Sequence, residues 1–74
     1  MSNNSPHIRN KIHVLRAEKR MTQQALAKEV GASRQTIIAI EKERYTPSLL
    51  LAFQIAHVFD VSITEVFEFQ LGED

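Results

Sequence analysis

The chain contains no cysteine, which excludes a disulfide framework, a thiolate zinc site and a cysteine nucleophile. It has only two glycines and two prolines, and 43% of its 74 residues are hydrophobic, so a disordered tail, a collagen-like repeat and a flexible linker are excluded as well. The longest uninterrupted apolar run, residues 49–53, is far too short to span a membrane. The first six residues lack the basic and apolar pattern of a secretory signal. We therefore expect a soluble cytoplasmic protein that folds as one domain, residues 1–74.

The chain has no net charge, but its charges are unevenly placed. All nine Lys and Arg residues and four acidic residues lie in residues 1–44, which carry a net charge of +5. Residues 45–74 contain five acidic residues and neither Lys nor Arg, which gives −5. Such asymmetry indicates a polyanionic partner for the first half of the chain. Chance segregation along a short chain is the alternative interpretation.

Apolar residues recur at helical spacing in the first half of the chain, and capping residues divide this pattern into three helices. Ser5-Pro6 is typical of a helix start, so a first helix is expected from there to residues 19–20. Thr22 is expected to cap a second helix, Gly31 to close it in the left-handed conformation, and Ser33 to cap a third. The residues expected on the apolar faces of these helices are Ile8, Ile12, Leu15, Leu26, Ala27, Val30, Ile37 and Ile40.

Two further helices are expected in the second half of the chain. Thr46-Pro47 has the same cap-and-proline pattern and is expected to open a fourth helix, which Asp60 ends. The spacing of Ser62 and Glu65 is that of a capping box, which predicts a short fifth helix from Ile63. The residues expected on the inward side of the fourth helix are Leu49, Ala52, Phe53, Ala56 and Phe59.

Residues 23–42, QQALAKEVGASRQTIIAIEK, contain the most informative pattern in the chain. Ala27 is small where two helices would cross closely, and Gly31 tolerates positive φ at the turn. Ile37 and Ile40 would then pack the third helix onto the second. With these residues at this spacing, the chain resembles the Cro/phage-repressor (XRE-type) helix-turn-helix family over residues 8–67. The residues that carry the resemblance are Thr22-Gln23, Leu26-Ala27, Val30-Gly31, Ser33-Arg34-Gln35-Thr36-Ile37, Ile40-Glu41, Pro47-Ser48-Leu49 and Val61-Ser62.

The resemblance implies an all-α fold, namely a five-helix lambda-repressor-like DNA-binding domain, with or without a short C-terminal strand. It also implies sequence-specific binding of double-stranded DNA, with the N-terminal end of the third helix in the major groove. There Arg34 would contact guanine and Gln35 would contact adenine. Thr36 either packs against the domain or contacts a thymine methyl group. Ile38 is expected to be exposed, and it either contacts thymine methyl groups or is an ordinary surface residue. The full set expected at the DNA is Gln23, Gln24, Ser33, Arg34, Gln35, Thr36, Ile38, Lys42, Arg44 and Tyr45.

Other polar residues are expected to have structural roles or none. The resemblance implies that Arg16 pairs with Glu41 and so orients the third helix. The three histidines, His7, His13 and His57, are scattered and show no metal-ligand spacing. No nucleophile, base and carboxylate set is visible. We expect no metal, no cofactor and no enzymatic activity.

The second half of the chain has more apolar surface than so small a domain can bury. We therefore expect a homodimer through residues 49–71, with two DNA-reading helices one duplex turn apart and a palindromic operator. Residues 67–71 alternate apolar and polar, as in a strand or a frayed helix end. Because residues 1–6 are poor in strand formers, a strand there favours its symmetry mate as partner. The residues expected at the interface are Leu50, Leu51, Val58, Val66, Phe67, Phe69 and Leu71.

The leading hypothesis from the sequence is a homodimeric transcriptional regulator that represses from a palindromic operator. The alternative is an antitoxin-like module that binds a partner protein and regulates its own synthesis, which the acidic and aromatic C-terminal segment motivates. The two overlap, because antitoxin-like members of this family also bind DNA. Neither hypothesis involves a membrane.

Overall fold

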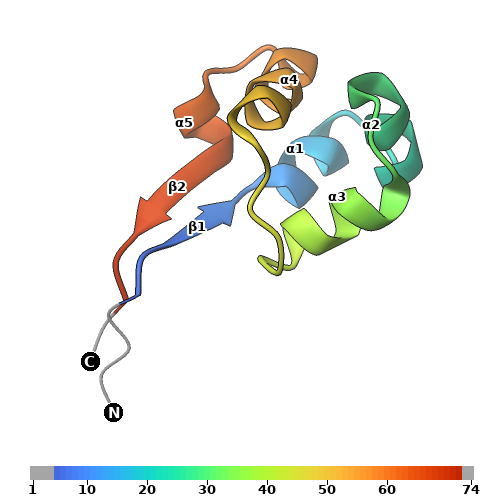
Figure 1. Cartoon of the computed structure of the whole chain (residues 1–74). Coiled ribbons are helices and arrows are strands. Elements are labelled where there is room, and N and C mark those ends of the chain that lie inside the picture. Colours follow the sequence, from blue (N-terminus) through green and yellow to red (C-terminus); the bar gives the residue numbers. More distant parts are fainter. Residues whose placement is uncertain (1–4, 73–74) are drawn as a thin grey trace.

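The computed structural model describes residues 5–72, and this stretch contains five helices and two strands. The helices pack into a bundle, and the strands form a ribbon that projects from it (Figure 1). The expected five-helix arrangement and the C-terminal strand are both confirmed. In chain order, the elements are β1 (His7–Asn10), α1 (Ile12–Glu18), α2 (Gln23–Val30), α3 (Arg34–Glu41), α4 (Leu49–Phe59), α5 (Ile63–Val66) and β2 (Phe67–Gln70).

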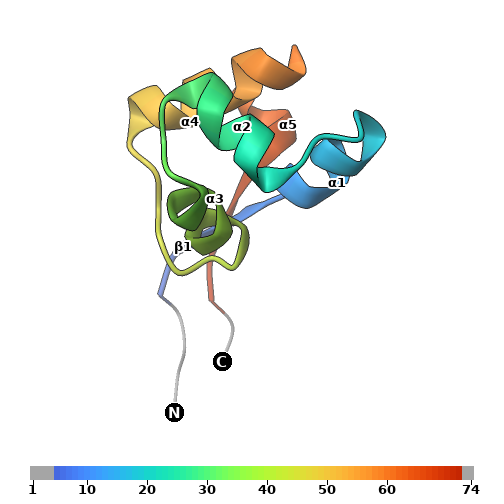
Figure 2. The ribbon, with the colours of Figure 1, turned by 90° about the vertical axis from the view of Figure 1, so that its right-hand side faces the viewer.

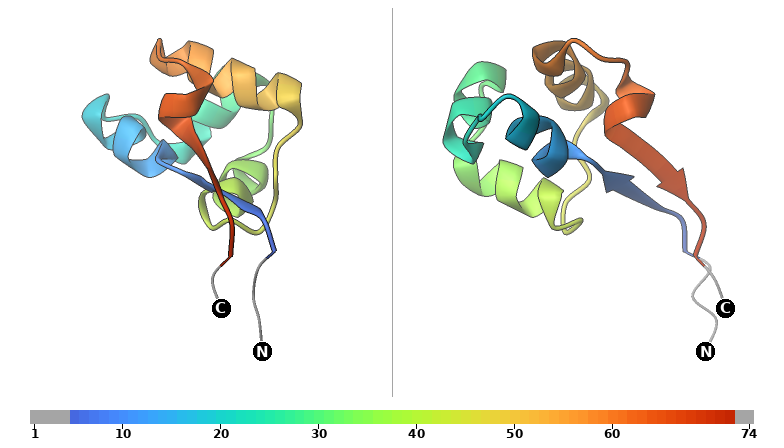
Figure 3. Two further views of the ribbon diagram at one scale, coloured as in Figure 1. Left: turned by 90° about the vertical axis from the view of Figure 1, so that its left-hand side faces the viewer. Right: turned by 180° about the vertical axis from the view of Figure 1, so that it is seen from behind.

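The ribbon corrects the expected partner of the C-terminal strand. β1 and β2 lie side by side (Figure 3) and pair antiparallel within the chain. Asn10 lies opposite Phe67, and Ile8 lies opposite Phe69. The prediction that β2 pairs with a symmetry mate was wrong, because it considered only residues 1–6 as the alternative strand. The strand forms directly after them, where Ile8 supplies a β-branched side chain across from an aromatic one, a pair that stabilises antiparallel ribbons.

The start of the first helix is also different from the prediction. α1 begins at Ile12, not at Ser5-Pro6, and Ile8 lies in β1 instead of on a helical face. The side chain of Asn10 accepts a hydrogen bond from the Ile12 amide through Oδ1 at 3.2 Å, which satisfies one of the free N–H groups at the start of the helix. The four-residue spacing from Ile8 to Ile12 is helical, but a strand followed by a turn accommodates it equally well.

The caps around the helix-turn-helix segment are confirmed. The hydroxyl of Thr22 accepts the Ala25 amide at 3.0 Å, and that of Ser33 accepts the Thr36 amide at 3.1 Å. Gly31 ends α2 in the left-handed conformation, with φ of 70°. Two helices separated by so short a turn are thereby fixed at both of the ends that meet.

The ends of α4 and α5 follow the expected pattern with one shift. Ser48, not Thr46, caps α4, since its hydroxyl accepts the Leu51 amide at 3.1 Å. Ser62 and Glu65 form the expected capping box of α5. The hydrogen bond from the Ser62 backbone amide, and then that from its side chain, lowers the pKa of Glu65. This cap therefore stabilises the fold above the ordinary pKa of a glutamate, and its contribution is lost as the pH falls through the lowered value.

Asp60 ends α4, as expected, in the left-handed conformation with φ of 56°. The conformation suits glycine better, and the carboxylate lies at the negative end of the helix dipole. We predict that Asp60→Gly raises the free energy of unfolding by about 0.5–1 kcal/mol in urea titrations. Gly31→Ala is the matched opposite case: no atom lies within 4 Å of an added Cβ, so the expected loss of about 1 kcal/mol comes from backbone strain alone. Equal stabilities for Asp60→Gly and the parent would contradict this account of the α4 end.

The buried side of α4 agrees with the prediction in part: Ala52, Ala56 and Phe59 are buried as expected. Leu49 is 70% and Phe53 is 53% exposed, although both were placed on the inward side. The helix sequence is apolar almost all round, so its periodicity does not separate two faces. Packing against α2 and α5 decides which residues are covered. The residues of α4 that are buried are Ala52, Ile55, Ala56 and Phe59.

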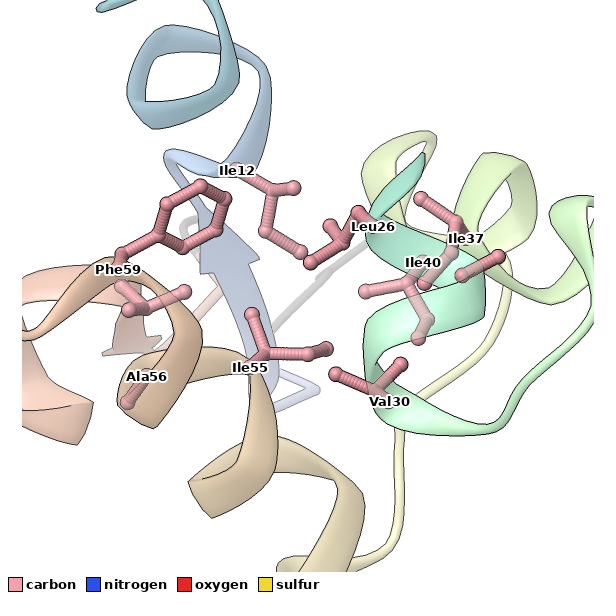
Figure 4. Packing of buried hydrophobic residues seen from close by; sticks show 10 residues of the cluster. Ile12, Leu26, Val30, Ile37, Ile40, Ile55, Ala56 and Phe59 are labelled. Atoms are coloured by element: carbon pink, nitrogen blue, oxygen red, sulfur yellow. The ribbon is translucent and has the colours of Figure 1, made fainter. Parts of the chain in front are cut away.

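The core lies where α1, α2, α3 and α4 meet (Figure 4). Leu26, Ile37 and Ile40 are almost fully buried, which confirms that α2 and α3 pack through the expected residues. Ala27 is buried as well, so a small side chain does lie where the helices approach. Within residues 5–72, none of the helices has the length and apolar character needed to cross a membrane.

Candidate nucleic-acid interface

α3 lies at the lower edge of the helical bundle, directly below α2, against which it packs (Figure 2). Ile37 and Ile40 fix its inner face in the core. Arg34 and Gln35, in its first turn, are both exposed. The backbone of this turn is held by the Ser33 cap. The two side chains with the best-defined base-pairing patterns therefore project from a rigid element into open space.

The remaining side chains of α3 are less available than the sequence indicated. Thr36 is half-buried, and its hydroxyl lies 2.9 Å from that of Ser33, so the two belong to one local network. Ile38 was expected to be exposed, but it is half-buried, as is Ala39. The helix is only eight residues long, and tertiary packing covers more of its circumference than a single apolar stripe predicts. Exposed polar groups on α3 are thus concentrated in its first turn.

The predicted pair of Arg16 and Glu41 is present. Arg16 donates from Nε to Glu41 Oε2 at 2.6 Å and from Nη2 to Oε1 at 3.1 Å, a two-pronged contact. The third guanidinium nitrogen, Nη1, donates to the carbonyl of Met21 at 2.9 Å. The two charged side chains are only 18% and 10% exposed. Arg16 of α1 therefore fixes both the last residue of α3 and the segment that leads into α2.

Gln23 has a role that the sequence did not reveal. Its Nε2 donates to Glu41 Oε1 at 3.1 Å, and the side chain is half-buried. The residue expected to contact a phosphate is thus anchored to the Arg16–Glu41 pair, with one amide hydrogen still uncommitted. Its neighbour Gln24 is exposed. The contact between Gln23 and Glu41 also places the start of α2 beside the end of α3.

The loop after α3 leaves its three candidate DNA contacts, Lys42, Arg44 and Tyr45, exposed. Glu43, between them, adopts positive φ of 61°. Its carboxylate lies 4.0 Å from Nε of Arg9 in β1, and both side chains are well exposed. The acidic charge in this basic loop is therefore partly offset by a cation from the ribbon. No sequence pattern relates Arg9 to Glu43, because the pair joins segments far apart in the chain.

The residues expected at a dimer interface do not form one exposed set. Val66 is 1% exposed and belongs to the core, so its place in the interface is a correction. Leu51, Val58 and Phe67 are half-buried and pack against that core. Large apolar side chains that are exposed on α4 and after it are Leu49, Leu50, Phe53, Phe69 and Leu71.

Metal ligands are not gathered in the part of the chain that the structure describes: no group of three His, Asp or Glu side chains lies close enough to hold an ion. The polar groups that α3 and its surroundings expose are instead the side chains of Arg34 and Gln35, with basic and amide side chains beside them.

Comparison with known proteins assigns this arrangement to a family. The HTH_3 helix-turn-helix model matches residues 12–66, and the chain is 52% identical over 66 residues to an uncharacterised helix-turn-helix transcriptional regulator of Methanocaldococcus jannaschii, covering 89% of this chain and 100% of that protein. It is similar to a crystal structure from Bacteroides fragilis with a TM-score of 0.74 and 30% identity, over 82% of this chain and 98% of that one. It is also similar to the restriction-modification controller protein C.AhdI of Aeromonas hydrophila, with a TM-score of 0.69 and 26% identity, over 73% and 82% of the two chains. The chain therefore belongs to the HTH_3 (XRE/Cro-type) helix-turn-helix family of DNA-binding transcriptional regulators, and it is not an enzyme.

Proposed function

We propose that the chain is a repressor that binds a palindromic operator as a homodimer and reads it with the first turn of α3. The observation that carries this proposal is the exposure of Arg34 and Gln35 on a capped helix end. The Arg34 guanidinium matches O6 and N7 of guanine, and the Gln35 carboxamide matches N6 and N7 of adenine. Repression requires only that bound protein occupies the promoter. The proposed site of action is the cytoplasm, and the naming of relatives as transcriptional regulators supports a place inside the cell.

Phosphate contacts in the proposal come from both sides of α3. Gln24 and the free amide hydrogen of Gln23 lie at the start of α2, and the amide of Gln23 is held in place by Glu41. On the other side, the loop that follows α3 supplies Lys42, Arg44 and Tyr45. Ser33 presents its backbone N–H at the start of α3, and Thr36 and Ile38 offer only what remains exposed of their apolar groups. These contacts would set the register of the protein on the duplex and give the affinity its salt dependence.

The domain organisation that we propose is one unit over residues 1–74. The helix-turn-helix segment spans residues 23–42, and the dimerisation region lies within residues 49–71. Of the residues expected at the dimer interface, three are exposed: Leu50, Phe69 and Leu71. We add Leu49 and Phe53 to this set, because both are apolar and exposed. Large exposed apolar surface is typical of an interface. A two-fold axis through this region would place two α3 helices about 34 Å apart, one turn of duplex.

Selection from a pool of random duplexes, followed by sequencing, tests the function directly. We expect enrichment of a two-fold symmetric sequence whose half-sites are about 10 base pairs apart. Enrichment of an asymmetric single site would contradict the dimer while leaving base readout in place. No enrichment at all would reject the operator-binding role and leave only the partner-binding part of the antitoxin-like alternative.

The loop after α3 gives a prediction about salt. Lys42→Ala or Arg44→Ala should reduce the slope of log affinity against log salt by about 0.9 for each phosphate that the variant no longer neutralises. Sequence preference should hardly change, because phosphate contacts carry no base information. Lys19→Ala is the matched control, since Lys19 lines the groove on the α4 and α5 side of the molecule. Fluorescence anisotropy at four or five salt concentrations measures the slopes, and a slope equal to that of the parent in both loop variants removes the loop from the interface.

The dimer gives a second prediction. Phe69 is 63% exposed, so Phe69→Glu should keep the helical bundle folded, with only the ribbon pair of Ile8 weakened, while placing two carboxylates in the interface. We expect at least about a tenfold rise in the dimer dissociation constant in analytical ultracentrifugation, given the free energy of burying a Phe. Val14→Glu, an exposed apolar residue on α1, is the control and should not change it. A parent protein that sediments as an 8.5 kDa species at micromolar concentration would reject the dimer.

A further inference from the structure

Asn10 connects the ribbon to the DNA-reading helix. Its Nδ2 donates to the carbonyl of Ile40, in the last turn of α3, at 2.8 Å. Its Oδ1 accepts the amide of Ile12, the first residue of α1, at 3.2 Å. A carboxamide is needed for both bonds, because a carboxylate accepts but does not donate. The two bonds also fix which way the carboxamide faces.

The position of Asn10 is itself held by neighbouring elements. It lies opposite Phe67 in the ribbon, and the next residue, Lys11, donates its backbone N–H to the carbonyl of Val66 at 2.9 Å. Asn10 is half-buried, so its bond to α3 is shielded from competition by water. The nearby contact of Arg9 with Glu43 joins β1 to the loop after α3 as well. The ribbon therefore holds the C-terminal end of α3 at a fixed place.

Arg34 and Gln35 lie near the opposite end of α3, about 8–9 Å from Ile40 along the axis of this eight-residue helix. Ile37, which is fully buried between the two ends, acts as the pivot. A shift of the Ile40 end relative to this pivot tilts the first turn, and bidentate base contacts tolerate little misplacement. Contacts to flexible phosphate groups are less demanding in geometry.

We propose that Asn10 is a positioning residue for base readout: it sets the tilt of α3 and thereby the discrimination between operator and other DNA. This inference rests on the proposed reading of bases by Arg34 and Gln35. It makes the ribbon part of the recognition apparatus, although Asn10 itself touches no DNA. It also means that a change in the ribbon reaches the reading helix through the side chain of Asn10.

The test compares the affinity for the selected operator with that for an unrelated duplex of equal length in the same buffer. Asn10→Asp keeps the acceptor for Ile12 and removes the donor to Ile40, and the charge it adds weakens both affinities and cancels in their ratio. We expect the ratio to fall about five- to tenfold, roughly half of the discrimination that one bidentate contact supplies. Asn10→Ser removes the donor without adding charge and should reduce the ratio similarly.

Two controls separate this role from a purely structural one and from failure of the proposed function. Phe59→Leu, in α4, destabilises the core from a helix that packs against α2 and α5, and it should leave the ratio unchanged at a temperature where the variant is folded. Arg34→Ala should lower the ratio of operator to unrelated-duplex affinity whether or not Asn10 positions α3. If Arg34→Ala lowers it and both Asn10 variants do not, the inference is wrong and base readout stands. If the parent shows no preference for any duplex, the proposed function fails.

A second measurement needs no DNA. Amide resonances in the ¹H–¹⁵N spectrum of Asn10→Ser should shift at Arg34 and Gln35 as well as at Ile40, because the whole helix moves. Shifts confined to the surroundings of residues 10 and 40 would show that α3 keeps its tilt without this bond, and would overturn the proposal.

Discussion

Replacing Glu41 with alanine is expected to lower the free energy of unfolding by about 2–4 kcal/mol. The substitution leaves the Arg16 guanidinium, 18% exposed, with only the Met21 carbonyl as partner. It also removes the acceptor of the Gln23 carboxamide. Breaking a fully buried pair costs more than this, and the residual exposure of both side chains allows water to replace some of the missing interactions.

Urea titrations of four variants isolate the contribution of charge. Glu41→Gln keeps an acceptor for Gln23 but removes the charge, so it should fall between the parent and Glu41→Ala. The double variant Arg16→Met, Glu41→Leu should recover much of the loss, because no unpaired charge remains buried. Arg9→Ala breaks the exposed contact with Glu43 at 4.0 Å and should change stability by less than about 0.5 kcal/mol. A loss for Glu41→Ala as small as that for Arg9→Ala would mean that the Arg16 pair stabilises no more than a surface contact does.

The sequence predicted those parts of the fold that depend on short-range chemistry. The caps formed by Thr22 and Ser33 and the left-handed Gly31 join residues at most a few positions apart, so the residue types alone indicate them. The pair of Arg16 and Glu41 spans 25 residues and came from the family resemblance. Nothing in local spacing would have located it.

What the sequence did not predict depends on contacts between distant segments. β1 exists because it meets β2 some 60 residues later, whereas Ile8 by itself fits a helical pattern. Three of the five residues expected on the inward side of α4 are buried, but the exposure of Leu49 and Phe53 was not predicted, because both are as apolar as the buried Ile55. The second bond of Asn10, to a carbonyl 30 residues away, leaves no trace in the sequence beyond a capping residue type before a helix. The candidate DNA contacts were inferred from the family resemblance. The hydrogen bond that anchors Gln23 to Glu41 was not predicted, because it depends on how α2 and α3 pack.

Removing the two exposed side chains of the first turn of α3 should have the largest effect on DNA binding. We expect Arg34→Ala and Gln35→Ala each to weaken binding to the operator by about 1–3 kcal/mol, with no loss of thermal stability. The fold should not respond, because both side chains are exposed and no hydrogen bond or ion pair of the described chain involves them. Gln54→Ala, an exposed glutamine on α4, is the matched control and should bind like the parent.

The pattern of lost specificity identifies which base each side chain reads. Competition with duplexes altered at one base pair should show Arg34→Ala indifferent at a position where the parent requires guanine, and Gln35→Ala indifferent at an adenine. Because Ile38 and Ala39 are half-buried and Thr36 is tied to Ser33, few other groups on α3 can replace them. The double variant should therefore bind operator and unrelated DNA with nearly equal affinity, through phosphate contacts alone. Two single variants that both keep the affinity and the base preferences of the parent would show that α3 does not enter the groove by its first turn.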